Sequence, residues 1–245
     1  MKILFSPSET KNDGGNLEYI NKNSFIFPEL FEKRLEILEK YNNFIKTASK
    51  EELEKLFGTK KIDVIEKYKV NIFKAPTKKA IQRYEGVAYD YLSYNNLNEQ
   101  TQKYLDENVI IFSNLIGPIL AGDKVIDYKL KQGETFENLK IDKYYNDNFS
   151  EVLDEYLQDE DILDLRAGFY EKFYTIKKPN YSMKFVKDGK VVSHFAKAYR
   201  GEILKLVAQN KIKTFEELLA LEIPNLGIIE IKEQKLKKEI VFSIG

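Results

Sequence analysis

The chain opens with MKILFSPSETKNDGG, residues 1–15, in which a short apolar run leads into a polar loop. The run Lys2 to Phe5 has the length and composition of a buried strand. Pro7 and the pair Gly14-Gly15 then break regular structure and predict a loop. In mixed α/β sheets, ligands bind where strands end in loops of this kind. We therefore expect a sheet with functional side chains directly after its strands.

Later segments repeat the same transition from strand to loop. NVIIFSNLIGPILAGD, residues 108–123, has an apolar run that ends at Ser113 and continues into a loop with glycine and proline. ILDLRAGFY, residues 162–170, places Asp164 and Arg166 at another strand end. Convergence of such residues at one sheet edge would form a cleft, although loop residues are polar in any case.

The C-terminal third predicts further strands. YSMKFVKDGKVVSHF, residues 181–195, alternates apolar and polar residues around Asp188-Gly189, a pair typical of a hairpin turn. LGIIEI (226–231) and EIVFSI (239–244) indicate two more strands. Together these segments predict an α/β (mixed α+β) fold, in which a central mixed sheet of six or seven strands is surrounded by helices.

Residues 28–75 have a helical pattern and form the expected helical lobe of a single domain, 1–245. Ser49 and Glu52 have the spacing of a capping box, and Gly58 separates two short apolar patterns. Two short helices around a glycine turn resemble a helix-hairpin-helix element, whose turn amides hold a phosphate. Lys60 and Lys61 follow the turn. An ordinary αα-hairpin explains the same pattern.

Composition excludes several classes of protein. The chain has no cysteine and one histidine, so a thiol peroxidase, a disulfide framework and the usual zinc sites are excluded, and we expect no metal or cofactor. Lys+Arg and Asp+Glu both number 39, so the formal net charge is zero. This balance argues against a surface covered in positive charge but does not exclude a local basic cleft. MKILFSPSETK is too short in its apolar part for a signal peptide, and no run reaches the ~18 residues of a membrane span. We expect a cytoplasmic protein.

VVSHFAKAYRGEILKLV, residues 191–207, contains the single histidine, His194. We expect a strand through Phe195 and a helix from about Tyr199. His194 is a candidate acid or base, or a structural residue of the strand. Lys197 and Arg200 are three residues apart and share a face if the helix includes both. Two cations at a helix start oppose the dipole unless an anion such as phosphate also binds there.

Five ordered blocks along nearly the whole length resemble known sequence blocks. They are ILFSPSETK, RYEGVAYDYL, VIIFSNLIGPILAGDKVIDYKL, LDLRAGFY and VVSHFAKAYRG. In this order and content they resemble the YaaA family, which is associated with resistance to peroxide stress. The matching residues are Pro7, Ser8, Glu9, Lys11, Tyr84, Gly86, Val87, Tyr89, Asp90, Ser113, Gly117, Asp123, Ile126, Tyr128, Leu130, Asp164, Arg166, Gly168, Tyr170, His194, Lys197, Ala198 and Gly201. Lys129 stands where the family usually has arginine. An anion there would contact the single ammonium of a lysine in place of the two-pronged guanidinium of an arginine.

The resemblance implies an intracellular protein that limits peroxide damage, with a compact α/β fold, a helix-hairpin-helix-like element and a positive cleft that binds duplex or damaged DNA. We expect a monomer that does not bind membranes. The expected DNA- or anion-binding residues are Ser8, Lys11, Gly58, Lys60, Lys61, Tyr128, Lys129, Arg166, Lys197 and Arg200.

Two alternatives remain open. The first is an enzyme that acts on a nucleotide or nucleobase in the same cleft, although the sequence has no established catalytic motif. Its candidate catalytic residues are Glu9, Tyr89, His194 and Lys197. The second is a structural protein that binds a partner through an exposed apolar patch.

Overall fold

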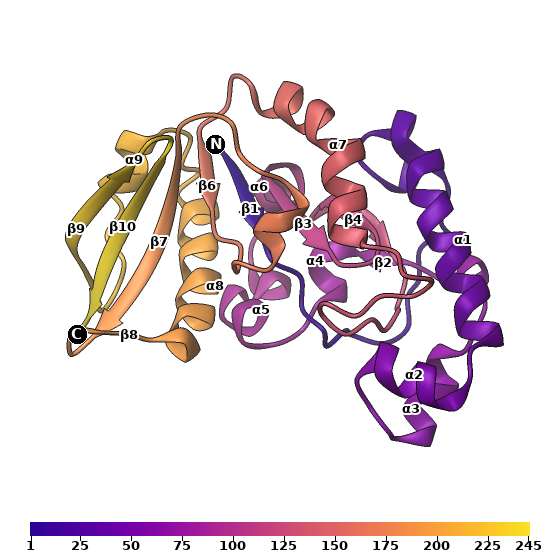
Figure 1. The fold of residues 1–245 in the computed structure, drawn as a ribbon. Helices are drawn as coiled ribbons and strands as arrows, with labels where there is room; N and C mark the ends of the chain where they lie inside the picture. Colours follow the sequence, from indigo (N-terminus) through magenta and orange to yellow (C-terminus); the bar gives the residue numbers. More distant parts are fainter.

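The central strands of the sheet are parallel. The computed structural model describes the backbone of residues 1–245 and the side chains of all residues except Ser193 and His194 (Figure 1). β1 (Lys2–Phe5) lies between β3 (Val109–Ser113) and β6 (Ile162–Asp164), and all three run in the same direction. Every residue of β3 is buried, as expected for a strand covered on both faces.

Further strands extend the sheet on both sides of this centre. Its order is β4-β3-β1-β6-β7-β10-β9, with the short β8 paired to β7. The sheet is therefore mixed, because β10 is parallel to β7 but β4, β8 and β9 pair in antiparallel fashion. The bounds are β4 (Gly117–Leu120), β7 (Asn180–Lys187), β8 (Lys190–Val191), β9 (Leu226–Gln234) and β10 (Lys237–Ile244). A separate small pair joins β2 (Lys78–Lys79) to β5 (Lys124–Val125).

The mixed α/β class predicted from the sequence is confirmed, with eight strands in the main sheet where six or seven were expected. Figure 1 shows helices around this sheet, with α7 and α1 on one side of the view and α8 beside β7. The helices are α1 (Phe31–Thr47), α2 (Lys50–Phe57), α3 (Ile62–Tyr68), α4 (Ala80–Arg83), α5 (Val87–Leu92), α6 (Glu99–Asn108), α7 (Ile141–Leu157), α8 (Ser193–Gln209) and α9 (Phe215–Leu219). Short 3₁₀ turns occur at Lys22–Ser24, Pro28–Leu30, Ile72–Lys74, Tyr94–Asn96 and Tyr170–Phe173.

Local capping explains where α2 begins and ends. The Ser49 hydroxyl accepts a hydrogen bond from the Glu52 N–H, and the Glu52 carboxylate accepts one from the Ser49 N–H, so the predicted capping box is confirmed. Gly58 ends α2 in the left-handed conformation, with φ of 64°. Residues 58–61 then connect α2 to α3.

The start of α8 differs from the expectation. The hairpin strand β8 ends at Val191 and α8 begins at Ser193, so the predicted strand through Phe195 and the predicted helix start near Tyr199 are wrong. Ala196, Ile203 and Val207 are buried, and Ala196 continues the buried helical stripe two turns back from Ile203. Within the described part of the chain, every helix is too short or too polar to cross a bilayer.

Candidate functional site

The parallel strands bring three loop starts to one edge of the sheet. Because β1 lies between β3 and β6, the residues after these strands are neighbours. The Ser6 hydroxyl, after β1, accepts a hydrogen bond of 2.8 Å from the Ala167 N–H, after β6. Ser113 is the last residue of β3. This edge therefore brings together segments that are far apart in the sequence.

Lys11 is buried against aromatic rings at this edge. Its backbone forms an isolated bridge with Tyr84, and only 7% of its surface is exposed. Nζ lies 4.0 Å from the ring centroid of Tyr128 and 5.5 Å from that of Tyr84. It also donates to the carbonyl oxygens of Ser8 and Glu9, each at 3.4 Å, which is long for a hydrogen bond. The sequence predicted an anion-contacting lysine, whereas the structure places this amine beneath the loop after β1.

Burial lowers the pKa of Lys11 to about 7, because the charged ammonium loses its hydration. Asp127 raises this pKa and Lys129 lowers it, and both effects are smaller than that of burial. Asp127 lies 3.2 Å from Nζ of Lys67 and forms its salt bridge there. Among the described side chains, no carboxylate lies within 4.0 Å of the Lys11 ammonium. The pKa of Lys11 therefore falls into a range in which a substantial part of the amine is uncharged.

Buried hydroxyl groups form a chain beside Lys11. The Tyr84 and Tyr128 hydroxyl oxygens are 3.3 Å apart, and the Tyr128 hydroxyl is 2.7 Å from Oγ of Ser113. The Tyr128 hydroxyl also donates to Oδ1 of Asn114 at 3.0 Å. Burial raises the pKa of both tyrosines, so they remain neutral near pH 7. These groups therefore add neutral hydroxyls, and no negative charge, to the surroundings of Lys11.

Arg166 is buried in a complete set of contacts. Its guanidinium donates two hydrogen bonds of 2.9 Å to the Asp164 carboxylate and one of 2.9 Å to the Tyr174 carbonyl. It lies 4.6 Å from the ring centroid of Phe112, and 2% of its side chain is exposed. The predicted anion-binding Arg166 is therefore already paired, and any anion would have to compete with Asp164.

Lys197 and Arg200 line a cavity of about 440 Å³ next to this edge. The cavity wall includes the loop after β1, the start of α5 and the segment after β6. Lys197 is exposed, and burial lowers the pKa of the partly buried Arg200 guanidinium. Both cations fall beyond the first turn of α8, so the expected opposition to the helix dipole is small. Neither forms a salt bridge within 4.0 Å with a described carboxylate.

Two of the predicted catalytic residues also belong to this cavity. Glu9 is exposed, and its Oε1 accepts a hydrogen bond of 2.9 Å from the Gln132 N–H. Tyr89 is buried, donates to the Ser6 carbonyl at 2.9 Å, and has its pKa raised by burial. Tyr89 therefore positions the loop after β1. The predicted acid or base His194 lies outside the described side chains.

Two glycines allow the cavity walls to approach closely. Gly86, with φ of 119°, precedes α5, and a Cβ atom there would lie 3.2 Å from Oγ of Ser8. A Cβ atom on Gly201 would lie 1.9 Å from the Ala88 carbonyl oxygen. Only glycine lets α8 pack this closely on α5, and this contact holds the cations of α8 beside the loop after β1.

The α2–α3 turn is linked to the cavity through one loop. The Lys131 N–H donates to the Leu56 carbonyl at 2.8 Å, and the next residue, Gln132, lines the cavity. Lys60 and Lys61 in the turn are exposed, and Lys129 is partly buried near Lys11. Gly58, Lys60 and Lys61 do not line the cavity itself.

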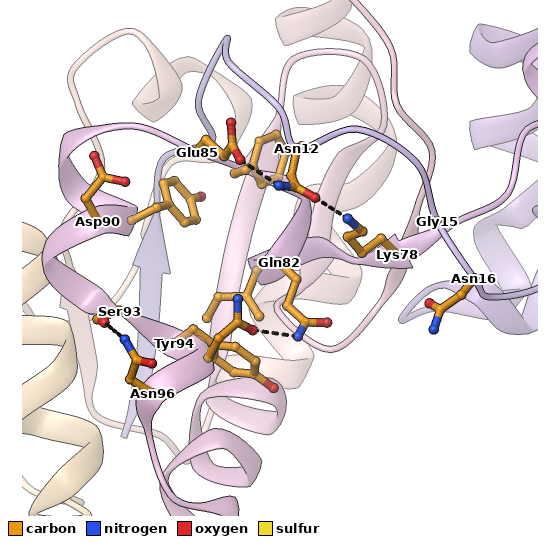
Figure 2. A pocket seen from close by; sticks show the side chains of 14 residues that line it. Asn12, Gly15, Asn16, Lys78, Gln82, Glu85, Asp90, Ser93, Tyr94 and Asn96 are labelled. Atoms are coloured by element: carbon orange, nitrogen blue, oxygen red, sulfur yellow. Dashed lines mark hydrogen bonds between the residues drawn. The ribbon is translucent and has the colours of Figure 1, made fainter.

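A second cavity, of about 750 Å³, was not predicted from the sequence (Figure 2). It shares Glu85 and Tyr89 with the smaller cavity. Figure 2 shows several amide side chains in its wall, and the Gln82 amide donates to Oδ1 of Asn95 at 2.7 Å. The run Tyr94-Asn95-Asn96 is the sequence feature that points to this cavity. Its amide side chains offer both hydrogen-bond donors and acceptors without a charge. The other polar lining residues include Asn12, Asn16, Lys78, Asp90, Ser93 and Asn96.

Within the described side chains, no group of three or more His, Asp or Glu residues is arranged to hold a metal ion. The partner-binding alternative requires an exposed apolar patch. Three exposed isoleucines lie on the edge strand β9: Ile228, Ile229 and Ile231.

Comparison with known proteins identifies the family. Residues 1–230 match the family model described as peroxide stress protein YaaA. The chain belongs to the YaaA family. An uncharacterized protein of Campylobacter jejuni is 53% identical over 244 residues, which cover 100% of this chain and 99% of that relative. A UPF0246 protein of Fusobacterium nucleatum is 29% identical over 257 residues, covering 99% and 98% of the two chains. A UPF0246 protein of Corynebacterium glutamicum is 30% identical over 238 residues, covering 90% and 91%.

The resemblance to the YaaA family seen in the sequence is thereby confirmed, and the structure shows what its blocks have in common. Lys11 from the first block contacts Tyr84 from the second and Tyr128 from the third. Gly201 from the fifth block packs on Ala88, within the second. In this YaaA-family chain the separate sequence blocks build one connected region at the sheet edge.

Proposed function

We propose that this YaaA-family protein acts in peroxide stress by binding DNA, with Lys197 and Arg200 contacting phosphate groups. The observation that carries the proposal is that both cations line one cavity and neither forms a salt bridge within 4.0 Å with a described carboxylate. The hydroxyl-bearing residues Ser6 and Ser8 line the same cavity and add neutral hydrogen-bonding groups. Cations and hydroxyls are the groups that proteins use to contact DNA phosphates.

Two acids in the cavity limit its positive field. Glu9 accepts a hydrogen bond from the Gln132 N–H, and Glu85 accepts one of 2.7 Å from the Asn12 amide. These bonds hold one oxygen of each carboxylate toward the protein. The balance of charge favours a few discrete phosphate contacts over a broad positive surface, so the dependence of affinity on salt should be moderate.

The α2–α3 turn supplies a second contact in this proposal. Lys60 and Lys61 are exposed, and Figure 1 places the turn and the start of α8 toward the same lower side of the view. α3 has only seven residues, so its dipole is weak and the lysine charges carry the contact. The turn would then grip the backbone of a duplex while the cavity binds another phosphate.

A binding titration tests the proposal. The fluorescence anisotropy of labelled duplex, nicked and single-stranded DNA is measured at several salt concentrations for the wild type and for a Lys197→Ala/Arg200→Ala variant. The variant should bind at least 10-fold more weakly at low salt, and the slope of log K against log salt should fall by about two. A Lys103→Ala/Lys143→Ala variant is the matched control, because it loses the same charge from exposed sites on α6 and α7.

Equal affinity of the cavity variant and the control variant would remove the cavity from the DNA site. Binding that does not change with salt, or no binding to any DNA form, would contradict the proposal as a whole.

The larger cavity favours a second candidate function, the binding of a nucleotide or nucleobase. Its amides can pair with the edge of a base, and Tyr84, Tyr89 and Tyr94 contribute aromatic groups. Because it shares Glu85 and Tyr89 with the cation-lined cavity, a base in one and a phosphate in the other would be neighbours. Calorimetric titration with AMP and adenosine should show tighter binding of AMP. A Gln82→Ala/Asn95→Ala variant should weaken both ligands, and Lys197→Ala should weaken AMP alone.

A further inference from the structure

Lys11 is a buried amine that the proposed DNA contacts do not use. It faces two tyrosine rings, two carbonyl oxygens and a chain of hydroxyl groups, and no carboxylate binds it directly. A lysine held only to stabilise the fold is usually paired with an acid when it is buried. A lysine that acts as a nucleophile needs the opposite environment, one that disfavours the ammonium form.

The position of the amine relative to the cation-lined cavity suggests a substrate class. Nζ contacts the carbonyls of Ser8 and Glu9, and both residues line the cavity that also contains Lys197 and Arg200. The amine therefore lies one layer of backbone away from a space with two cations. Residues 6–10 belong to no helix or strand, and the inference requires this segment to move aside, with loss of contacts such as the hydrogen bond from Tyr89 to the Ser6 carbonyl.

We infer that Lys11 forms an imine with an aldehyde that carries a phosphate group, with the phosphate bound by Lys197 and Arg200 in the cavity. The neutral amine adds to the carbonyl carbon, forming a C–N bond and a carbinolamine. The C–O bond then breaks, and the carbonyl oxygen leaves as water with the two hydrogens that the amine loses. No oxidant or reductant is needed.

The surroundings of the amine suit both steps. The Tyr84 and Tyr128 hydroxyls stay neutral, so they can donate a hydrogen bond to the departing oxygen without pairing with the ammonium. Ser113 and Asn114 orient the Tyr128 hydroxyl at 2.7 and 3.0 Å. The charged groups that act on Lys11 are Asp127, Lys129, Glu9 and Arg83, and burial outweighs each of them. With a pKa of about 7, the amine is half neutral at pH 7.

A phosphorylated aldehyde has two sources, a free sugar phosphate or an abasic site in DNA. Only the DNA source rests on the proposed DNA binding, because a free sugar phosphate needs the cavity alone. The chemistry at Lys11 is the same for both sources, so parallel arms of one trapping experiment distinguish them.

The test is reductive trapping followed by peptide mass mapping. The full-length protein is incubated with cyanoborohydride and either glyceraldehyde 3-phosphate, unphosphorylated glyceraldehyde or an oligonucleotide with one abasic site. We expect the adduct at Lys11 to exceed that at the exposed Lys103 at least 10-fold with one of the phosphorylated probes, with half-maximal trapping near pH 7. Lys11→Arg should abolish this adduct, and Lys197→Ala/Arg200→Ala should slow trapping of the phosphorylated probes but not of glyceraldehyde.

Each outcome separates the hypotheses. Trapping of the sugar phosphate alone supports a small-molecule substrate, and it stands even if DNA binding fails. Trapping of the abasic oligonucleotide supports a DNA substrate. Adducts that are no more frequent at Lys11 than at Lys103 in the wild-type protein overturn the inference, and this comparison does not depend on the folding of any variant.

Discussion

Two buried cations near the same sheet edge have opposite surroundings. Arg166, after β6, binds the Asp164 carboxylate through two hydrogen bonds of 2.9 Å. Lys11, after β1, has no carboxylate partner among the described side chains and instead contacts carbonyl oxygens at 3.4 Å. Both lie over an aromatic ring, Phe112 for Arg166 and Tyr128 for Lys11. Both cations therefore contact an aromatic ring, but only Arg166 forms a salt bridge with a described carboxylate.

This contrast separates a structural cation from a reactive one. The donors of Arg166 are directed at fixed acceptors, so its charge is compensated inside the protein. Lys11 keeps a burial cost that the nearby Asp127 and Glu9 offset only in part, and this cost appears as a lowered pKa. Four tests address the contrast, beginning with the largest expected effect.

Removal of the acid beside Arg166 should have the largest effect. Asp164→Asn leaves the guanidinium buried without a counter-charge, and we expect a loss of about 3–5 kcal/mol in the free energy of unfolding. Chemical denaturation measures this loss. Asp147→Asn is the control, because Asp147 pairs with Lys143 on the exposed face of α7 and should cost less than about 0.5 kcal/mol. Equal effects of the two substitutions would mean that the buried pair contributes nothing.

Lys11→Met tests whether the lysine is as uncompensated as its contacts indicate. With a folded pKa of about 7 against 10.5 in the unfolded chain, the unfolded state binds more protons between these values. Stability of the wild type relative to Lys11→Met should therefore rise with pH above 7, by up to about 1.4 kcal/mol per pH unit. Denaturation curves at pH 7, 8.5 and 10 measure this difference. Parallel pH profiles for the two proteins would show that the ammonium is not destabilised by folding.

Substitutions at two glycines compare the packing beside the cavity with the packing in the loop after Arg166. Gly201 packs on Ala88 beside the cavity, and Gly201→Ala should cost about 1–3 kcal/mol because the added Cβ meets the Ala88 carbonyl. Gly168 follows Arg166 in its loop, and a Cβ there meets nothing within 4 Å. Gly168→Ala should therefore be nearly neutral in thermal unfolding. A Gly201→Ala variant as stable as Gly168→Ala would contradict the close α5–α8 contact.

Tyr128→Phe should have the smallest effect and sharpens the role of the hydroxyl chain. The ring beneath Lys11 remains, but Ser113 and Asn114 lose their partner, which should cost about 1 kcal/mol. Because the ring is kept, the pH dependence assigned to Lys11 should survive in this variant. Loss of that dependence would show that the hydroxyl, not burial, sets the pKa of Lys11.

Local patterns predicted much of the fold. The run Lys2 to Phe5, the capping box of Ser49 and Glu52, and the Asp188-Gly189 hairpin are all set by residues near one another in sequence, and the structure contains each of them. The start of α8 was misplaced because apolar and polar residues alternate after Val191 as they do in a strand. In the structure the residues from Ser193 onward form the first turn of α8.

The candidate site was predictable only in part. Sequence reasoning selected Lys11, Tyr128 and Arg166 as anion-binding residues, but their burial depends on strands that meet only in the folded chain. Whether a cation has an acid partner is a long-range property, and no local spacing distinguishes Lys11 from Arg166. The amide-lined cavity was missed because its wall comes from several separate segments.

The absence of a side chain at Gly201 has a mechanical consequence. With α8 seated directly on the backbone of α5, the two helices should move as one rigid body, and Lys197 and Arg200 move with Gly86 and the wall of the cavity. The distance between these cations and the part of the wall formed by α5 should therefore stay constant. A ligand that fits between α5 and α8 therefore binds at little entropic cost to these two helices, and any widening of the cavity has to come from residues 6–10.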